Sequence, residues 1–504
     1  MAIAHITTIG RLGMRCFPIT VEVDVSHGLP AFNIVGLPDT IVQESKERIR
    51  SAIKNSGATF PLLRITVNLA PADIKKEGVG FDLPIALGIL AASDQIPLPS
   101  ADTYFYGELG LQGELKSTRG TLAFLIHAKN ATRAFISSAN QFEGGLVAER
   151  TPVYVADSLQ TLVETLKGEQ PETRITPHLP DSSPSFATDF ADIHGQQAAK
   201  RALEIAAAGH HNILLSGPPG AGKTLLSRAI PSIMPPLTHD EMLETTQIYS
   251  VAGLLSDEHP IIHSRPFRSP HHSASMVAII GGGNPPRPGE ITLAHNGVLF
   301  LDEFAELPRM VIEALRQPLE DKVVTVARAG FSAEFPAHCL LVAAVNPCPC
   351  GFQGDPKHHC TCTPQQLIMY KKKLSGPILD RIDLHLTVPA VEVSDLTKTV
   401  TAESSQAVRD RVRSARNRQI ERYKAIGLSA NSQLTNKHIP HFCNQTPEAQ
   451  GLIERAIDKL NLSARSYHRL LKIALTIADL EGSDTIQASH IAEAIQYRPQ
   501  SSHH

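Results

Sequence analysis

The sequence predicts an α/β protein that ends in an all-helical unit. Two apolar strands carry the α/β prediction: residues 212–216 lead into a glycine-rich loop, and residues 298–301 end in two adjacent carboxylates. The helical prediction comes from apolar residues that recur at helical spacing in three C-terminal segments, residues 452–460, 464–480 and 488–495.

Length and charge limit the possible classes. The chain has 504 residues, and at about 150 residues per domain this predicts roughly three domains. Its 47 Lys and Arg against 50 Asp and Glu give a net charge of −3, which excludes a wholly basic nucleic-acid coat and confines any polyanion site to a local patch. The longest apolar run, residues 83–92, is too short to span a bilayer, and no secretory signal precedes it. We therefore expect a cytoplasmic protein without a membrane segment.

The first part of the chain, residues 1–168, has the pattern of a compact α/β unit. Residues 64–69 alternate apolar and polar side chains as a strand does, residues 42–55 place apolar side chains at helical spacing, and residues 83–92 are typical of a buried helix. Residues 169–189 contain several prolines among small polar residues, which predicts a linker.

Residues 217–224 fit the phosphate-loop pattern G-x-x-x-x-G-K-[ST] between a predicted strand and a predicted helix. The glycines let backbone N–H groups approach phosphate oxygens, and the helix N-terminus adds positive potential. We expect Lys223 to neutralise the β- and γ-phosphates of ATP and the Thr224 hydroxyl to bind Mg²⁺. The expected ATP-binding residues are Gly217, Pro218, Pro219, Gly220, Ala221, Gly222, Lys223, Thr224 and Leu225.

Two further strands are expected to bring polar groups to this site. The strand at residues 298–301, about 75 residues downstream, ends in Asp302 and Glu303. Asp302 can hold Mg²⁺, and Glu303 can polarise the attacking water. The strand at residues 339–345 ends in Asn346, whose amide can orient that water, although asparagine is also common as a plain turn residue at a strand end.

Three longer stretches accompany these motifs: residues 265–272, 281–291 and 379–383. Together with the phosphate loop, the carboxylate pair and Asn346, residues 379–383 resemble the AAA+ ATPases. Within that superfamily, residues 265–272 and 281–291 resemble the ComM/YifB family of magnesium-chelatase-like proteins, and the resemblance covers nearly the whole chain.

This resemblance implies a domain plan. Residues 1–168 would form a Lon-protease-like α/β domain, and residues 169–189 the linker. Residues 190–390 would form the AAA+ core with a pore hairpin and a zinc-binding loop, and residues 391–500 an all-helical lid.

The resemblance also implies catalytic arginines. Arg381 takes the position of an arginine finger that acts in trans on the ATP of a neighbouring subunit. Arg465 takes the position of the sensor-2 arginine of the lid, with Arg469 as the alternative. Without the family position, each arginine would more often be a surface or ion-paired residue. A finger acting in trans needs a heterologous contact that closes into a ring, and the family implies a homohexamer.

Two basic positions are candidates for DNA contact. Residues 323–335 are typical of a β-hairpin, and in related ring helicases such a hairpin projects into the pore with a basic residue at its tip, where Arg328 lies. Arg287 is a second candidate, and such residues follow phosphates without sequence preference. The alternative is a hairpin packed on its own domain with a solvated arginine. The basic run at residues 409–424 fits either a phosphate site or a solvated helix face paired with acidic neighbours such as Glu421.

Four of the seven cysteines crowd into one C-x-C…C-x-C set, which is not a secreted disulfide framework. Four thiolates complete a tetrahedral zinc ion without an open position, so we expect a structural zinc. His358 and His359 are candidate substitutes for one cysteine, and four reduced thiols are the alternative. The cysteines are Cys348, Cys350, Cys360 and Cys362.

Residues 73–87 and 107–113 resemble the Lon-protease catalytic fold. Lon-type hydrolysis needs a serine nucleophile activated by a lysine. The serine position holds Asp82 and the lysine position holds Leu122, and neither side chain can do this chemistry. We expect an inactive fold used for ring assembly or DNA contact, whereas a shifted alignment would point to Lys116 with Ser117.

The leading hypothesis is an ATP-driven hexameric DNA helicase that promotes branch migration in homologous recombination during natural transformation. Its expected cofactors are ATP, Mg²⁺ and a structural zinc, and its expected partners are single-stranded and branched DNA and recombination proteins. One alternative is a metal-chelatase-type motor, which the resemblance in residues 265–290 favours. A less favoured alternative is an ATP-dependent Lon-like protease.

Overall fold

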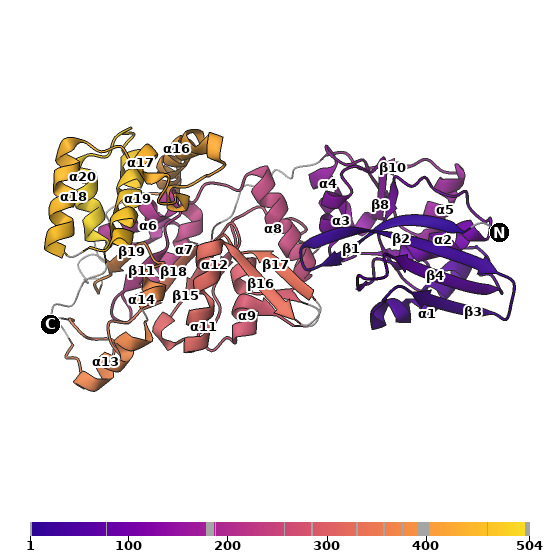
Figure 1. Ribbon diagram of the computed structural model, residues 1–504, viewed down its shortest axis with the longest axis horizontal. Helices are drawn as coiled ribbons and strands as arrows, with labels where there is room; N and C mark the ends of the chain where they lie inside the picture. The colour runs from indigo at the N-terminus through magenta and orange to yellow at the C-terminus, as the bar shows by residue number, and fades with distance from the viewer. Residues whose placement is uncertain are drawn as a thin grey trace.

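The computed structural model describes residues 3–76, 78–177, 186, 188–256, 258–283, 286–328, 331–355, 358–374, 376–390, 403–460 and 462–498, without the side chains of Arg328 and Phe331. Figure 1 shows an elongated molecule in which an N-terminal lobe lies at one end, a central α/β lobe follows, and the C-terminal helices lie at the other end. The predicted combination of α/β parts with a helical C-terminus is confirmed.

The N-terminal lobe is built on one mixed sheet. The middle strands alternate as predicted: in β4, Ile65, Val67 and Leu69 are buried while their neighbours are not. The almost wholly buried helix α2 packs against β1 and β2. In spatial order the strands are β10 (Thr173–Arg174), β9 (Val153–Ala156), β8 (Arg133–Ser137), β5 (Thr103–Phe105), β1 (Ala4–Leu12), β2 (Arg15–Ser26), β4 (Arg64–Ala70) and β3 (Ala31–Val35).

Five helices and a small hairpin complete this lobe. They are α1 (Thr40–Asn55), α2 (Asp82–Ala92), α3 (Thr121–His127), α4 (Gln141–Val147), α5 (Leu159–Lys167), and the pair β6 (Glu108–Leu109) and β7 (Leu115–Lys116).

The predicted linker begins with ordered structure. Strand β10 pairs antiparallel with β9, and the Ile175 N–H donates to the Val153 carbonyl at 2.9 Å. The first sheet therefore extends past Gly168, while the proline-rich residues 178–185 lie outside the described residues.

The central lobe contains a five-stranded, all-parallel sheet. Its strands are short apolar runs, and β15 and β18 are buried along their whole length because helices cover both faces. In spatial order the strands are β12 (Phe267–Arg268), β15 (Val298–Leu301), β18 (Leu340–Val345), β11 (Ile213–Ser216) and β19 (Leu384–Thr387). The helices are α6 (Gln197–Gly209), α7 (Lys223–Ile233), α8 (His239–Ala252), α9 (Met276–Ile280), α10 (Glu290–Leu293), α11 (Arg309–Ala314), α12 (Arg316–Asp321), α13 (Pro364–Lys373) and α14 (Gly376–Leu379).

Two hairpins stand on the central lobe and contact each other. One is β16 (Val323–Arg328) with β17 (Phe331–Pro336), as predicted, and the other is β13 (Gly281–Gly282) with β14 (Arg287–Pro288). The turn between β1 and β2 of the N-terminal lobe lies against β17, where Arg15 pairs with Glu334 at 2.6 Å.

The C-terminal lobe consists of α16 (Ser405–Tyr423), α17 (Ile439–Phe442), α18 (Pro447–Leu460), α19 (Ala464–Leu480) and α20 (Ala488–Gln496). The basic run lies mostly on α16, and its cations bind groups of the same chain, which supports the ion-paired alternative. The contacts are Arg409 with the Ser232 carbonyl, Arg411 with Glu204 and Glu403, Arg413 with Asp410, Arg416 with the carbonyls of Ala207 and Ser429, Arg418 with Asp484, Arg422 with Asp479, and Lys424 with Glu421.

The N-terminal lobe packs on the central lobe through α3 and α8. Leu122 of α3 and Leu243 of α8 belong to one apolar cluster. Beside it, Ser250 Oγ donates to the Glu143 carboxylate at 2.6 Å and accepts from the Gly120 N–H at 3.1 Å. Within the described part of the chain, no helix combines the length and apolar composition needed to cross a bilayer.

Candidate nucleotide site, arginine groove and cysteine cluster

The phosphate loop connects β11 to α7, between Ser216 and Lys223. The Lys223 ammonium donates to the carbonyls of Gly217 at 2.7 Å and Pro218 at 3.0 Å, and to Oδ1 of Asn346 at 3.2 Å. Lys223 is buried, and burial lowers its pKa. The structure thus brings the predicted lysine and the predicted asparagine together, because β11 and β18 are neighbours whose carboxyl ends share one edge of the sheet.

A candidate magnesium site lies next to this lysine. Thr224 Oγ1 donates to Oδ2 of Asp302 at 2.9 Å, and Oδ1 of Asp302 accepts from the Glu303 N–H at 2.9 Å. A hydroxyl and a carboxylate at this distance are hard oxygen ligands of the kind Mg²⁺ prefers. The residues present therefore fit the predicted ion.

Glu303 follows Asp302 and adopts a left-handed backbone conformation with φ 49°. Its Oε2 lies 3.0 Å from Nδ1 of His272, which sequence reasoning had not singled out. The strand register predicts this contact. In the parallel pair β12 and β15, Arg268 lies opposite Leu299, and His272 and Glu303 each follow four residues later. Sequence reasoning missed His272 because the register between these two strands cannot be obtained from a single motif.

Arg381 lies at the opposite edge of the same sheet. Its carbonyl accepts from the Asn212 side chain at 2.9 Å, at the amino end of β11, whereas the phosphate loop follows Ser216 at the carboxyl end. About 15 Å of strand separates these two ends. The Arg381 guanidinium pairs with Glu320 and donates to the Pro377 carbonyl at 2.8 Å, so its described partners lie at the amino end of the sheet and not at the phosphate loop.

The second predicted arginine lies beside the first. Nη2 of Arg465, at the start of α19, is 3.8 Å from Oε1 of Glu320. Arg469, the alternative, is less exposed and donates to the Asp380 carbonyl at 2.6 Å. These side chains line one cavity of about 1030 Å³, the arginine groove, whose lining includes Glu320, Arg381, Arg465, Arg469 and Lys472.

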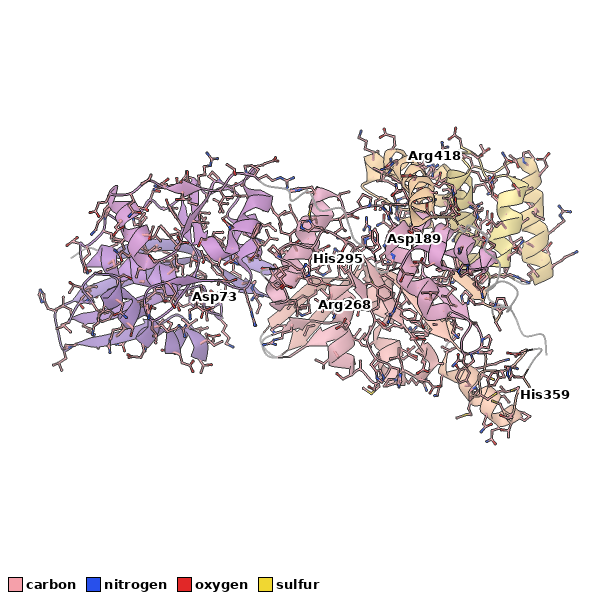
Figure 2. All side chains as sticks on the ribbon, turned by 180° about the vertical axis from the view of Figure 1, so that it is seen from behind. Asp73, Asp189, Arg268, His295, His359 and Arg418 are labelled. Atoms are coloured by element: carbon pink, nitrogen blue, oxygen red, sulfur yellow. The ribbon has the colours of Figure 1, made fainter. Side chains whose placement is uncertain are left out.

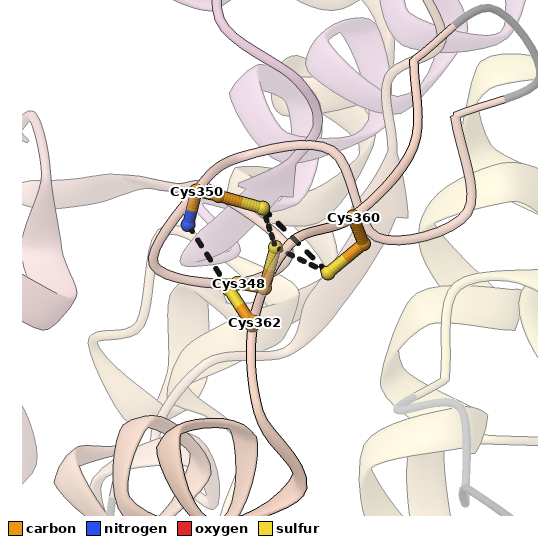
Figure 3. Close-up of side chains that lie close together, drawn as sticks. All are labelled: Cys348, Cys350, Cys360 and Cys362. Carbon is orange, nitrogen blue, oxygen red and sulfur yellow. Dashed lines mark hydrogen bonds between the residues drawn. The ribbon is translucent and has the colours of Figure 1, made fainter.

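The four predicted zinc ligands come together within 4.8 Å of one another. Figure 3 shows their sulfurs converging, with Cys348 Sγ 3.3 Å from Cys350 Sγ and 3.7 Å from Cys360 Sγ. The Phe352 N–H lowers the pKa of Cys350, while desolvation and the crowded sulfurs of Cys350 and Cys348 raise the pKa of Cys360 and Cys362, so the four thiols share their protons as one group. The donor set fits tetrahedral zinc.

Neither histidine belongs to this cluster. His358 instead lies 3.6 Å from Asp355, and His359 lies at the end of an arm that projects from the central lobe with α13 (Figure 2).

The loop that carries the cysteines also contacts the phosphate loop. The backbone of Gly351 lies so close to Pro219 that a Cβ atom at position 351 would be 2.7 Å from the proline ring.

The candidate DNA residues lie on the two adjacent hairpins. Arg287 of β14 is exposed. The backbone of Arg328 ends β16 opposite Phe331, and its side chain lies outside the described residues.

In the N-terminal lobe, Asp82, which takes the place of a Lon-type serine, is a buried carboxylate in an ion pair. Asp82 begins α2, is 1% exposed and receives two hydrogen bonds from Arg48, at 2.9 and 3.2 Å. Leu122 is buried in the contact with α8. Lys116 pairs with Glu114 at 3.7 Å.

A parallel sheet that places a phosphate loop, an Asp-Glu pair and an asparagine at the ends of three adjacent strands defines a P-loop ATPase domain of the AAA+ class. Sequence profiles described as magnesium chelatase subunit ChlI, subunit ChlI of Mg-chelatase, and the ChlI C-terminal part match residues 189–396, 21–140 and 402–498.

Two relatives align along their whole length. YifB of Escherichia coli is 44% identical over 502 residues, which cover 99% of this chain and 97% of YifB. The competence protein ComM of Haemophilus influenzae is 43% identical over 508 residues, which cover 99% of this chain and 98% of ComM. The chain therefore belongs to the ComM/YifB family of magnesium-chelatase-like proteins. A shorter match, 30% identity over 156 residues, covers 29% of this chain and 27% of Lon protease 2 of Bacillus subtilis.

Proposed function

We propose that this protein is an ATP-driven DNA motor that forms a homohexameric ring and promotes branch migration during recombination of incoming DNA. The carrying observation is that the phosphate loop and the arginine groove lie at opposite edges of one sheet. A complete catalytic pocket then needs the phosphate loop of one subunit and the groove of the next, which is a heterologous contact that can close into a ring.

Within each pocket, we assign the steps to this chain's own groups. Lys223 neutralises the terminal phosphates, Glu303 polarises the attacking water and Asn346 orients it. Thr224 and Asp302 would hold Mg²⁺, which would supply positive charge against the β- and γ-phosphates. Arg381 and Arg465 of the adjacent subunit supply positive charge as the terminal phosphate departs.

The DNA part of the proposal is supported by the two adjacent hairpins and by one relative, which is a competence protein. Arg287 and Arg328 offer cations that track phosphates irrespective of sequence. We propose a cytoplasmic location, where both ATP and DNA are present, and domain boundaries at 190 and 390, with the first domain ending after β10 and not at 168. We also propose that the N-terminal lobe is inactive as a protease, which the buried Asp82–Arg48 pair supports.

The test measures ATP hydrolysis without DNA and with single strands, duplexes and four-way junctions. Lys223→Ala is expected to abolish hydrolysis and branch migration. Arg328→Ala and Arg287→Ala are expected to lower DNA stimulation and to weaken its dependence on salt. Arg455→Ala, on the outer surface of α18, serves as the matched control and should change neither quantity.

A wild-type protein that stays monomeric with saturating nucleotide, or that leaves a four-way junction untouched, would contradict this proposal.

The second candidate is a metal-insertion motor, favoured by the three chelatase profiles. Metal insertion into a porphyrin by a reconstituted mixture would decide for it.

A further inference from the structure

Arg381 and Arg465 come from different lobes, yet both approach one carboxylate. Glu320, near the end of α12, pairs through Oε2 with Arg381, and its Oε1 lies 3.8 Å from Nη2 of Arg465. Two guanidinium groups this close repel each other, and a carboxylate between them offsets that repulsion. The Arg381 hydrogen bond is also the main cause of the lowered pKa of Glu320.

Arg381 is not fully satisfied by its own chain. Its side chain is 14% exposed, and its Nε is buried without a hydrogen-bond partner among the described residues. An exposed ion pair would contribute little, but a largely buried guanidinium that bonds both Glu320 and the Pro377 carbonyl is held in place.

Glu320 is also tied to the β16–β17 hairpin. Only Asp321 and Lys322 separate it from β16, and the Lys322 N–H donates to the Pro318 carbonyl at 2.9 Å inside α12. At the other end of the hairpin, the Ala337 N–H donates to the Lys322 carbonyl at 2.8 Å. Both ends of the hairpin are therefore fastened beside Glu320, so a displacement of the hairpin displaces this carboxylate.

We propose that Glu320 is a positioning residue that holds Arg381 and Arg465 as a pair facing the triphosphate of the neighbouring subunit, and that links the position of the DNA-contact hairpin to that pair. The inference rests on the proposed function, in which two subunits share each pocket. Glu320 itself does not touch the nucleotide: it acts on the adjacent subunit's ATP through the two arginines.

The test is Glu320→Gln, which keeps the shape and removes the charge. The turnover number of DNA-stimulated ATP hydrolysis is expected to fall between about 10- and 100-fold, as for a misplaced catalytic group. The KM for ATP should change little, because the variant's own phosphate loop is intact. The matched control is Glu421→Gln, which removes a surface glutamate paired with Lys424 and should leave turnover unchanged.

Mixing subunits separates this inference from the function on which it rests. Lys223→Ala subunits lack a working phosphate loop but keep the arginine groove, whereas Glu320→Gln subunits have the reverse defect. An equal mixture should regain about one quarter of wild-type turnover, the share of random interfaces that combine both intact halves. Recovery also shows that the Glu320→Gln subunits are folded.

The same mixture is made with Arg381→Ala in place of Glu320→Gln. If the Arg381→Ala mixture recovers and the Glu320→Gln mixture does not, or if Glu320→Gln alone keeps full turnover, the role of Glu320 is disproved while the shared pocket stands. If neither mixture recovers, the shared pocket is disproved and the role of Glu320 with it.

Discussion

The polar groups of the nucleotide site hold one another in position. Asn346 accepts from Lys223 at 3.2 Å, and Asp302 accepts from Thr224 at 2.9 Å. Each group sits at the end of a strand or the start of a helix whose partners are fixed by the parallel sheet. Reacting groups positioned in this way lower the barrier because little reorganisation is left for the chemical step.

Asp82 gives a prediction about pH. Burial raises its pKa from 3.8 to about 6, and the hydrogen bonds from Arg48 only partly counter this, because the carboxylate is far more buried than the arginine. The folded state therefore holds the proton more tightly than the unfolded chain. Protonated Asp82 therefore stabilises the folded state by on the order of 3 kcal/mol at and below about pH 4, and this stabilisation is lost as the pH rises through about 6.

The measurement is the free energy of unfolding of the wild type minus that of Asp82→Asn, from urea titrations followed by circular dichroism. This difference is expected to increase in favour of the wild type between pH 7 and pH 4. The exposed Asp102→Asn serves as the control, with a difference that does not show this rise. A difference that is flat with pH for Asp82→Asn would contradict the prediction.

At this scale, the sequence suffices for residues whose role follows from a local pattern. Asp302 and Asn346 directly follow recognisable strands, and Lys223 begins the helix after the phosphate loop, so their meeting at one site could be anticipated. His272 and Glu320 could not, because their roles depend on the register of β12 against β15 and on the packing of α12 near α19. Both contacts join residues that are far apart in the sequence, and a single motif does not predict such contacts.

Among the elements, the cysteine loop has a role beyond its own stability. It starts two residues after Asn346 and rests on the phosphate loop through Gly351 and Pro219. A bound zinc ion would fix the conformation of this loop, and through that contact it would also restrict the phosphate loop.

Loss of the metal ligands should therefore affect nucleotide binding. The purified protein is expected to hold about one zinc per chain, and Cys360→Ser to hold none. The KM for ATP of the variant should rise about 3- to 10-fold, as a loss of roughly 1 kcal/mol of binding implies. Metal analysis and steady-state kinetics check both, with Cys16→Ser, outside the cluster, as the control. Zinc-free wild type with an unchanged KM in Cys360→Ser would refute the link.

Element types were easier to predict than element roles. The segments at residues 42–55, 64–69 and 83–92 fold as predicted, because their periodicity is local. The basic helix α16 was ambiguous, since its acidic partners, such as Glu204 and Asp479, lie far away in sequence. The strand β10 was missed because its own residues have no strand pattern, and it is a strand because it pairs with β9.

On the scale of the whole molecule, the described residues of the N-terminal lobe contact the central lobe in two regions. One lies around α8, which packs on α3 and pairs through Asp240 with Arg150. The other is the β1–β2 turn, which lies against the β16–β17 hairpin at Gly13 and Ala333. The lobe therefore contacts an element that the proposed function places on DNA, and its attachment should matter for the motor.

Ser250→Ala tests this attachment. The serine joins the buried Glu143 carboxylate, whose pKa burial raises, to the Gly120 N–H, and its loss leaves two buried groups short of a partner. A cost of about 2 kcal/mol is expected. Because the lost bonds span the two lobes, hydrogen exchange should accelerate along α3 and α8 together, and DNA stimulation of ATP hydrolysis should fall. Ser483→Ala, in a turn of the C-terminal lobe, should leave both unchanged. Faster exchange with undiminished DNA stimulation would show that the lobe is attached to the motor without influencing it.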